Sequence, residues 1–262
     1  MRPDQDRLFP ADLRKEQTIV VTGASSGFGF EIAKRFLLEG YKVVALARRI
    51  ERLENLAIYS PSRVLIRALD VSDAESVAHF FATIPEKFAD IHCLVNNAGL
   101  SKGFGPVDAA DPQNWTTMVD TNVKGLLFCT KHCLPYLLQR ACSHIINIGS
   151  IAAHYPYMGG NVYAATKAFV SNFSLNLLAD LQGKNVRVTY IAPGMAKTEF
   201  ALVRFDGDEA RAESLYEGID PLTPEDVAEA VYWCYSMPPH VNINVVELMP
   251  ANQPFSLGFS KK

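Results

Sequence analysis

Residues 22 to 29 read Thr22-Gly23-Ala24-Ser25-Ser26-Gly27-Phe28-Gly29, directly after an apolar run and at the start of a helical pattern. Glycine lets the backbone approach a pyrophosphate, and the first turn of a helix offers unpaired N–H donors and a positive dipole end. The spacing Gly-x3-Gly-x-Gly departs from the G-x-G-x-x-G fingerprint, so a tight turn without a ligand is the competing interpretation. The flanking strand and helix favour a dinucleotide site, with contacts from Gly23, Ser25, Ser26, Gly27, Phe28 and Gly29.

Outward from this loop, apolar strand-like runs alternate with helical patterns. The expected strands are Thr18–Val21, Val43–Leu46, Val64–Leu69, His92–Val95, His144–Ile148, Val186–Ile191 and Ile243–Leu248. Their near-continuous β-branched content predicts parallel strands that are covered on both faces. The alternation predicts an α/β protein with a single-domain Rossmann fold, a doubly wound parallel sheet of about seven strands with helices on both faces. Ligands of such sheets bind beyond the carboxyl ends of the strands.

Three of the expected helices carry start signals. In a capping box, the side chains of the capping residue and of a glutamate three positions on accept hydrogen bonds from free N–H groups of the first turn. Proline suits the position after a capping residue, because the N–H that it lacks would have no partner there. The signals are a capping box at Ser72 and Glu75, and the pairs Asp111-Pro112 and Thr223-Pro224. No linker or internal repeat interrupts the pattern. We therefore expect a polar extension over residues 1–16, the Rossmann oxidoreductase domain over 17–250, and a tail over 251–262 near the substrate site or a subunit interface.

Composition excludes several classes of protein. The 262 residues are 48% hydrophobic and 20% charged, as is usual for a globular enzyme, and the formal net charge of −3 offers no electrostatic footprint for nucleic acid or anionic lipid. No apolar stretch reaches the roughly 18 residues of a membrane span, and the first 16 residues lack the apolar core of a secretory signal. The five cysteines, an odd number without a Cys-x-x-Cys pair, predict buried reduced thiols, no metal site and a cytoplasmic location.

The second expected strand indicates which nicotinamide cofactor is bound. A site for NAD usually has an acid there for the ribose 2′-hydroxyl, whereas arginine can accommodate a 2′-phosphate. Here the chain reads Ala47-Arg48-Arg49, with no acid before Glu51. Two solvated charges at a helix start are the alternative. We predict NADP(H), with Arg48 and Arg49 at its 2′-phosphate.

Tyr163 and Lys167 are four residues apart on a predicted helix, so they share a face. A nearby cation favours phenolate and would lower the tyrosine pKa toward neutrality, which suits a residue that exchanges a proton with a substrate oxygen. Ser150 follows the fifth expected strand, where its hydroxyl could bind a developing alkoxide. Asn122 lies inside an expected helix, and a functional role requires its amide to turn inward. Taken singly, each of these residues is also compatible with a structural role.

From Thr18 to Leu248 the sequence resembles the short-chain dehydrogenase/reductase family. Its motifs match Thr22–Gly29, Leu69-Asp70-Val71 and Asn96-Asn97-Ala98-Gly99, and its Asn–Ser–Tyr–Lys tetrad matches Asn122, Ser150, Tyr163 and Lys167. The resemblance implies cofactor contacts from Asp70, Val71, Asn97, Ala98, Gly99, Tyr163, Lys167, Pro193, Gly194 and Thr198. It also implies that Tyr163 transfers the proton, Lys167 lowers its pKa and holds the nicotinamide ribose, Ser150 orients the substrate oxygen, and Asn122 anchors a proton-relay water.

Segments near the carboxyl end resemble a narrower group, the NADP-dependent 3-hydroxy acid dehydrogenases. They are Asn161-Val162-Tyr163, Thr198-Glu199-Phe200 with Val203-Arg204-Phe205, His240–Asn244 and Glu247–Pro250. That resemblance implies oxidation of serine or allo-threonine, or interconversion of malonic semialdehyde and 3-hydroxypropionate, by a homodimer or homotetramer. Sulfoacetaldehyde reductases, which form isethionate, share much of the pattern.

Two further readings compete with it. A non-catalytic NADP-binding regulator could have the same fold, although Tyr163 and Lys167 are both present. A steroid or long acyl reductase would have a wide apolar substrate loop, whereas residues 200–218 carry several charges. We predict that Arg204, Tyr157 and Gln253 bind the acidic end of a short substrate, together with Ser150 and Tyr163. The sequence does not decide between a carboxylate and a sulfonate substrate. It also leaves open the direction of reaction, the oligomeric state and the role of the N-terminal extension.

Overall fold

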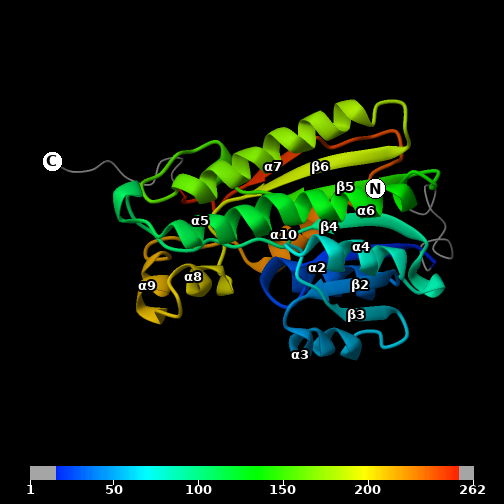
Figure 1. Ribbon diagram of the computed structural model, residues 1–262, viewed down its shortest axis with the longest axis horizontal. Coiled ribbons are helices and arrows are strands. Elements are labelled where there is room, and N and C mark those ends of the chain that lie inside the picture. Colours follow the sequence, from blue (N-terminus) through cyan, green and yellow to red (C-terminus); the bar gives the residue numbers. More distant parts are fainter. Residues whose placement is uncertain (1–15, 254–262) are drawn as a thin grey trace.

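Seven parallel strands form one sheet, in the order β3-β2-β1-β4-β5-β6-β7 (Figure 1). The computed structural model describes residues 16–253. The strands are β1 Thr18–Thr22, β2 Lys42–Ala47, β3 Val64–Ala68, β4 Ile91–Asn96, β5 Ser143–Ile148, β6 Val186–Pro193 and β7 Val245–Leu248. The predicted doubly wound parallel sheet is therefore confirmed. Residues 1–15 of the predicted N-terminal extension and residues 254–262 of the predicted tail lie outside the described residues.

The last strand begins two residues later than the sequence pattern predicts. Ile243 was expected to open it, but β7 starts at Val245. The side chain of Asn242 accepts a hydrogen bond from Val188 N and donates one to Val188 O, both at 2.9 Å. Before β7 begins, the side-chain amide of Asn242 therefore makes hydrogen bonds to β6 of the kind that a paired strand makes through its backbone.

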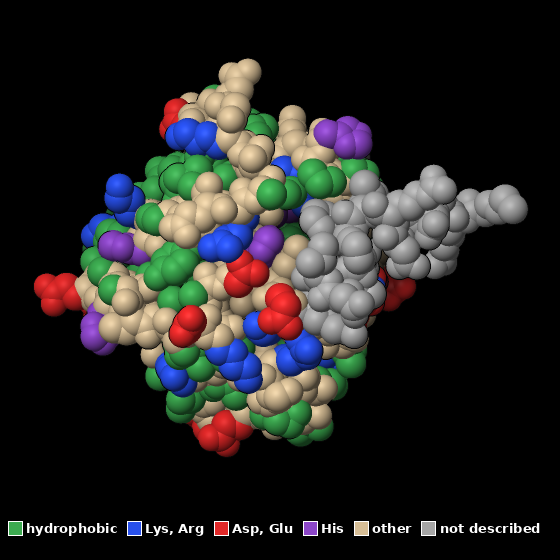
Figure 2. All heavy atoms as spheres, turned by 90° about the vertical axis from the view of Figure 1, so that its right-hand side faces the viewer, with side chains coloured by type: hydrophobic (Ala, Val, Ile, Leu, Met, Phe, Trp, Pro, Cys, Tyr) green, Lys and Arg blue, Asp and Glu red, His purple; other side chains and the backbone are tan. Residues whose placement is uncertain are grey.

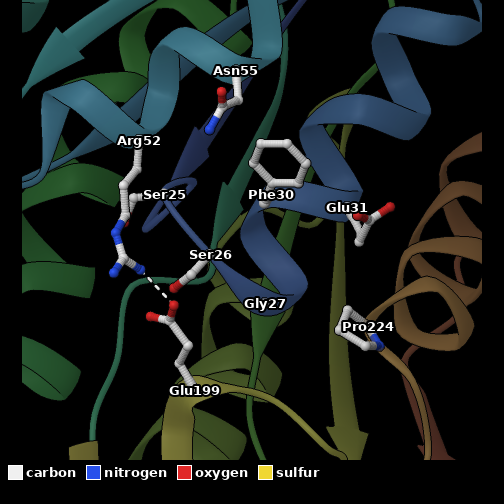
Figure 3. Close-up of a pocket in the computed structure, with 9 residues that line it drawn as sticks. All are labelled: Ser25, Ser26, Gly27, Phe30, Glu31, Arg52, Asn55, Glu199 and Pro224. Atoms are coloured by element: carbon white, nitrogen blue, oxygen red, sulfur yellow. Dashed lines mark hydrogen bonds and ion pairs between the residues drawn. The ribbon is translucent and has the colours of Figure 1, made fainter.

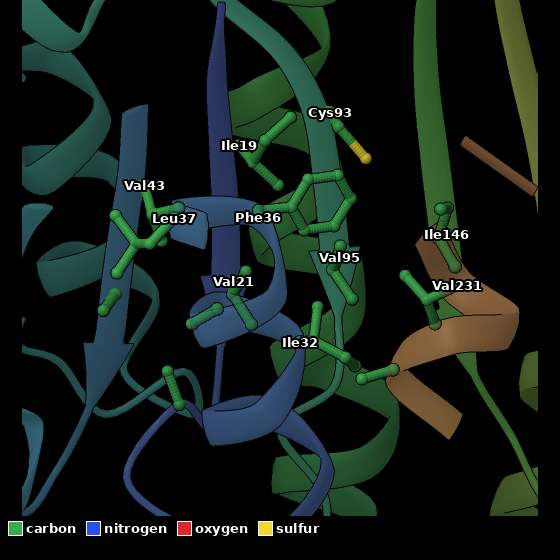
Figure 4. Packing of buried hydrophobic residues seen from close by; sticks show 14 of the residues in the cluster. Ile19, Val21, Ile32, Phe36, Leu37, Val43, Cys93, Val95, Ile146 and Val231 are labelled. Atoms are coloured by element: carbon green, nitrogen blue, oxygen red, sulfur yellow. The ribbon is translucent and has the colours of Figure 1, made fainter. Parts of the chain in front are cut away.

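Helices cover both faces of the sheet. They are α2 Gly27–Leu38, α3 Ile50–Leu53, α4 Ala74–Ala82, α5 Pro112–Val119, α6 Leu126–Leu137, α7 Asn161–Asp180, α8 Glu199–Arg204, α9 Glu209–Ser214 and α10 Pro224–Ser236. Alternate residues of β1 enter two separate cores, because successive side chains of a strand point to opposite faces. Ile19 and Val21 pack with Phe36 of α2 and Val231 of α10 (Figure 4), whereas Val20 packs in the layer of α4, α6 and α7.

Two of the three predicted helix starts are confirmed, and one is corrected. Asp111 caps α5, and Thr223 forms a capping box with Asp226 at α10. At α4 the cap is Asp73, not Ser72, because the Asp73 carboxylate accepts hydrogen bonds from Glu75 N and Ser76 N. The cap therefore lies one residue further along, and the Ser72 hydroxyl donates to Asp70 instead.

The strand order creates the place where a site can form. The chain builds β2 and β3 on one side of β1 and the remaining strands on the other, so the loops after β1 and β4 diverge. A crevice opens at such a switch point, beyond the carboxyl ends of the strands. The short helices α8 and α9 lie together beyond one end of the sheet (Figure 1).

The charged side chains and the thiols can be located in the fold. Figure 2 shows acidic and basic side chains interspersed on one face of the molecule. All five thiols are free, four of them buried and Cys142 partly exposed. Within residues 16–253, no helix is long and apolar enough to cross a bilayer, and no group of three His, Cys, Asp or Glu side chains could hold a metal ion.

Candidate active site

A cleft of about 640 Å³ lies at the carboxyl ends of the strands and extends to α8. Nearly all of the residues predicted for cofactor or substrate line it. They are Gly23, Ser25, Ser26, Gly27, Phe28, Arg48, Arg49, Asp70, Val71, Asn97, Ala98, Gly99, Ser150, Tyr157, Tyr163, Lys167, Pro193, Gly194, Thr198, Arg204 and Gln253. Gly29 and Asn122 lie behind this lining, where they support it. The fold therefore brings together residues that follow each of the seven strands with residues of α7 and α8.

The glycine loop leaves the first turn of α2 open to the cleft. Ser26 is the N-cap residue but makes no side-chain capping bond, and the first turn contains no acid. Gly27 has a φ of +53°, a conformation in which glycine avoids strain. A Cβ at Gly29 would lie 2.3 Å from Gly23 O, so Gly29 permits helix and loop to pack closely. Uncapped N–H donors at a positive helix end fit an anion such as a pyrophosphate.

Asn97 ties the loop after β4 to the glycine loop. Its side-chain nitrogen donates to Thr22 O at 2.9 Å and to Gly23 O at 3.2 Å. The Thr22 hydroxyl accepts hydrogen bonds from the backbone N–H groups of Asn97 and Ala98, each at 3.0 Å. These hydrogen bonds hold the glycine loop against the loop after β4. The two walls of the crevice are therefore joined before a ligand binds.

The two predicted arginines differ in their surroundings. Arg48 is exposed at the cleft, whereas Arg49 Nη2 lies 3.0 Å from Ser26 Oγ and 3.1 Å from Glu199 Oε2. Arg52, which the sequence analysis did not single out, also binds Glu199. Figure 3 shows this pair beside a second, smaller pocket on the outer side of the glycine loop.

Tyr163 and Lys167 lie one turn apart on α7 and are both buried. Lys167 Nζ is 5.9 Å from the centroid of the Tyr163 ring and donates a hydrogen bond to Ile148 O at 3.0 Å. Burial lowers the pKa of Lys167 to about 8. The expected lowering of the Tyr163 pKa is wrong. Burial raises that pKa above its ordinary value, and the charge of Arg204 and a hydrogen bond with Ser150 offset the effect only in part.

Ser150 is held by a residue that the sequence analysis missed. The Tyr190 hydroxyl donates to Ser150 O at 2.9 Å and accepts from Ser150 N at 3.2 Å. A Cβ at Gly149 would lie 1.9 Å from the Tyr190 ring, so glycine is required there. Tyr190 is fully buried in β6 and looks in the sequence like any other apolar strand residue. The Ser150 side chain itself caps residues 151–153.

Asn122 lies in a π-helical turn, Asp120–Gly125, between α5 and α6. Its side-chain oxygen accepts a hydrogen bond from Leu100 N, and its nitrogen donates to Leu100 O, both at 2.8 Å. The nitrogen also donates to the Thr166 hydroxyl at 3.1 Å. The amide is thus turned inward, as a functional role requires. π turns of this kind are frequent at functional sites.

Arg204 brings a positive charge to the end of the cleft that α8 forms. Only 8% of this residue is exposed, and it makes no ion pair with a carboxylate of the described chain. Its Nε donates to Ser101 Oγ at 3.1 Å and its Nη2 to Tyr157 OH at 3.0 Å. The guanidinium lies 5.2 Å from the centroid of the Tyr163 ring. A buried cation over the tyrosine therefore has room for an anionic partner.

Gln253, which was predicted to bind the substrate together with Arg204 and Tyr157, lines the same cleft as they do. Its side-chain oxygen accepts a hydrogen bond from Met195 N at 2.7 Å. A Cβ at Gly194 would lie 2.6 Å from that oxygen. Gln253 therefore lines the cleft at the turn after β6, while Ser101, Phe104 and Phe200 are the neighbours of Arg204 that sequence reasoning missed.

This fold and site define an oxidoreductase class. Residues 17–208 match the sequence profile of the short chain dehydrogenase family, and the chain belongs to that family. It is 50% identical to a serine 3-dehydrogenase of Rhizobium radiobacter over 239 residues, which cover 91% of this chain and 96% of the relative. Over the same shares it is 49% identical to an NADP-dependent 3-hydroxy acid dehydrogenase of Escherichia coli K12.

Solved structures of two serine dehydrogenases are similar to this chain. The closed form of serine dehydrogenase complexed with NADP⁺ superposes with a TM-score of 0.90 at 48% sequence identity, covering 94% of this chain and 99% of that one. The serine dehydrogenase of Escherichia coli superposes with a TM-score of 0.80 at 45% identity, covering 90% of this chain and 99% of that one.

Proposed function

We propose that the protein is an NADP(H)-dependent dehydrogenase that interconverts a short 3-hydroxy acid and the corresponding aldehyde or ketone. Serine, allo-threonine and 3-hydroxypropionate are the candidate alcohols, and malonic semialdehyde is a candidate carbonyl substrate. The names of the similar proteins support the cofactor and the substrate class. Arg204 is the observation in this chain that carries the proposal, because its buried charge lies beside Tyr163.

The cofactor would bind along the cleft, with its pyrophosphate at the first turn of α2 and its 2′-phosphate at Arg48 and Arg49. The nicotinamide supplies the hydride acceptor or donor. Lys167 would contact the adjoining ribose; a Cβ at Gly99 would lie 3.4 Å from its Nζ, so glycine leaves the space beside the ammonium open. The residues of this chain would orient the cofactor and the substrate and supply the charges that bind them.

Tyr163 would exchange the proton with the substrate oxygen. Because burial raises its pKa, the phenol is protonated at neutral pH and can donate to a carbonyl oxygen. Ser150, held by Tyr190, would orient that oxygen through its hydroxyl. Asn122 would hold the backbone of Leu100 and anchor a water on the path of the proton to solvent.

The substrate anion would bind the guanidinium of Arg204. A planar guanidinium can form two parallel hydrogen bonds with an acid group, and the Tyr157 hydroxyl already fixes one side of it. A sulfonate offers oxygen acceptors of the same kind in a different geometry, so sulfoacetaldehyde is the alternative substrate. Malonic semialdehyde and sulfoacetaldehyde are both short aldehydes that carry an acidic group.

A substrate screen with Arg204→Ala tests the proposal. Loss of an interaction of about 2 kcal/mol should lower kcat/KM roughly 30-fold for malonic semialdehyde or sulfoacetaldehyde, whichever is the better substrate. Propionaldehyde should be much less affected. Arg211→Ala is the matched control, since this exposed arginine of α9 stacks on Phe205 outside the cleft. Equal losses on acidic and neutral aldehydes would assign Arg204 to loop structure and contradict the proposal.

A further inference from the structure

Glu199, the first residue of α8, forms ion pairs with two arginines that follow β2. Its Oε2 lies 3.1 Å from Arg49 Nη2, and its Oε1 contacts Arg52 Nη1, as the dashed line in Figure 3 marks. The side chains of these three residues are 40–42% exposed. Pairs in contact with water are individually weak and can be exchanged for other partners.

Arg49 uses one nitrogen for several acceptors. The same Nη2 that binds Glu199 lies 3.0 Å from Ser26 Oγ and 3.4 Å from Ser25 Oγ, both in the glycine loop. Arg49 therefore faces the end of the cleft at which the proposed function puts a 2′-phosphate. A phosphate approaching that edge of the guanidinium meets the Glu199 carboxylate, which carries charge of the same sign.

The carboxylate persists at working pH. Burial alone would raise the pKa of Glu199, but hydrogen bonds from Arg52 and Arg49 lower it below its ordinary value. Among the described residues that line the cleft, Asp70 is the other carboxylate, and its Oδ1 accepts two hydrogen bonds from Ser72. Glu199 is the one in contact with Arg49.

We propose that Glu199 is a cofactor-selectivity residue, whose carboxylate competes with the 2′-phosphate for Arg49 while Arg52 keeps hold of it. This inference rests on the proposed use of NADP(H). When the phosphate binds, Arg49 turns to it and Glu199 remains paired with Arg52. Glu199 thus weakens 2′-phosphate binding below what the arginines alone would give. Helix α8, whose last residue is Arg204, stays attached to α3 during the exchange.

Calorimetric titration of the purified protein with adenosine 2′,5′-bisphosphate and with AMP tests the competition directly. Glu199→Gln, which keeps the shape and removes the charge, should bind the bisphosphate about three- to tenfold more tightly and AMP within about twofold of wild type. Glu31→Gln is the matched control, because Glu31 lines the outer pocket but pairs with Lys34. It should leave both affinities nearly unchanged. An unchanged or lower bisphosphate affinity in Glu199→Gln would overturn the inference.

A double-mutant cycle separates Arg52 from the phosphate. Arg52→Ala should weaken bisphosphate binding about threefold, because Glu199 is then free to turn wholly to Arg49, and should have no effect in the Glu199→Gln background. A loss that persists in that background means that Arg52 binds the phosphate itself, and the inference fails. If wild type binds bisphosphate and AMP equally, the proposed NADP(H) function fails instead.

Discussion

Lys167 illustrates how a single buried charge serves a site at the expense of stability. It is buried, and among the described residues its ammonium donates a hydrogen bond to the carbonyl of Ile148. Burial therefore lowers its pKa from 10.5 to about 8. The folded state disfavours the ammonium, which the unfolded chain accommodates freely. Such a cation is retained where an interaction with a ligand makes use of it.

The pH dependence of folding should report this directly. Because the folded pKa of Lys167 lies below the unfolded one, its contribution is most unfavourable below pH 8 and fades as pH rises toward 10.5. Relative to Lys167→Met, the wild-type free energy of unfolding should therefore increase by about 1 kcal/mol between pH 7 and pH 9. Urea denaturation of both proteins at the two pH values measures it. A difference that stays constant or shrinks would contradict the lowered pKa.

The sequence identified residues whose spacing along one element implies contact. Tyr163 and Lys167 are four apart on a helix, and the helix places both on the same buried face. Spacing does not report contacts between distant segments. Tyr190 binds Ser150 from another strand, and Glu199 binds Arg49 across 150 positions, so neither could be predicted. For the same reason the pKa of Tyr163 was predicted in the wrong direction, because its burial depends on the whole fold.

At the level of elements, the strands were predictable because burial on both faces gives an unbroken apolar run. The π turn at Asp120–Gly125 was not, since one extra residue in a helical turn leaves no clear mark in the sequence. Its reason appears in the packing. A Cβ at Gly125 would lie 2.6 Å from the Val71 side chain, so the turn brings the backbone against the loop after β3. The same turn aims Asn122 at Leu100.

The corrected start of α4 gives a test at this scale. Asp73→Ala removes the acceptor for two N–H groups and should lower the free energy of unfolding by about 1 kcal/mol. Ser72→Ala removes only a hydroxyl that donates to Asp70, so its effect should be smaller. Denaturant titrations of the two variants measure the difference. A larger loss in Ser72→Ala would restore the capping box that the sequence pattern suggested.

In the whole molecule, the cleft joins segments that lie far apart in the sequence. Loops after the first strands build one end of the cleft, and α8 and the turn after β6 build the other. Helix α8 spans both ends, because Glu199 contacts the arginines and Arg204 lies over Tyr163. A ligand bound along the cleft therefore links the two halves of the sheet, and its binding energy is added to the stability of the folded chain.

Thermal unfolding should reveal which cofactor makes that link. A ligand at about 100 times its Kd adds roughly 2.7 kcal/mol, which for a chain of this size raises Tm by about 5–10 °C. We expect that shift with NADP, and a clearly smaller one with NAD at the same concentration, because NAD has no 2′-phosphate for Arg48 and Arg49. Replacing both arginines by alanine should reduce the NADP shift to that of NAD. Arg67→Ala is the control, since this exposed arginine of β3 donates a hydrogen bond to the neighbouring Ile66 carbonyl and lies outside the cleft, so the variant should preserve the difference. Equal shifts for the two cofactors in the unmodified protein would show that the arginines are solvated charges without a role in cofactor choice.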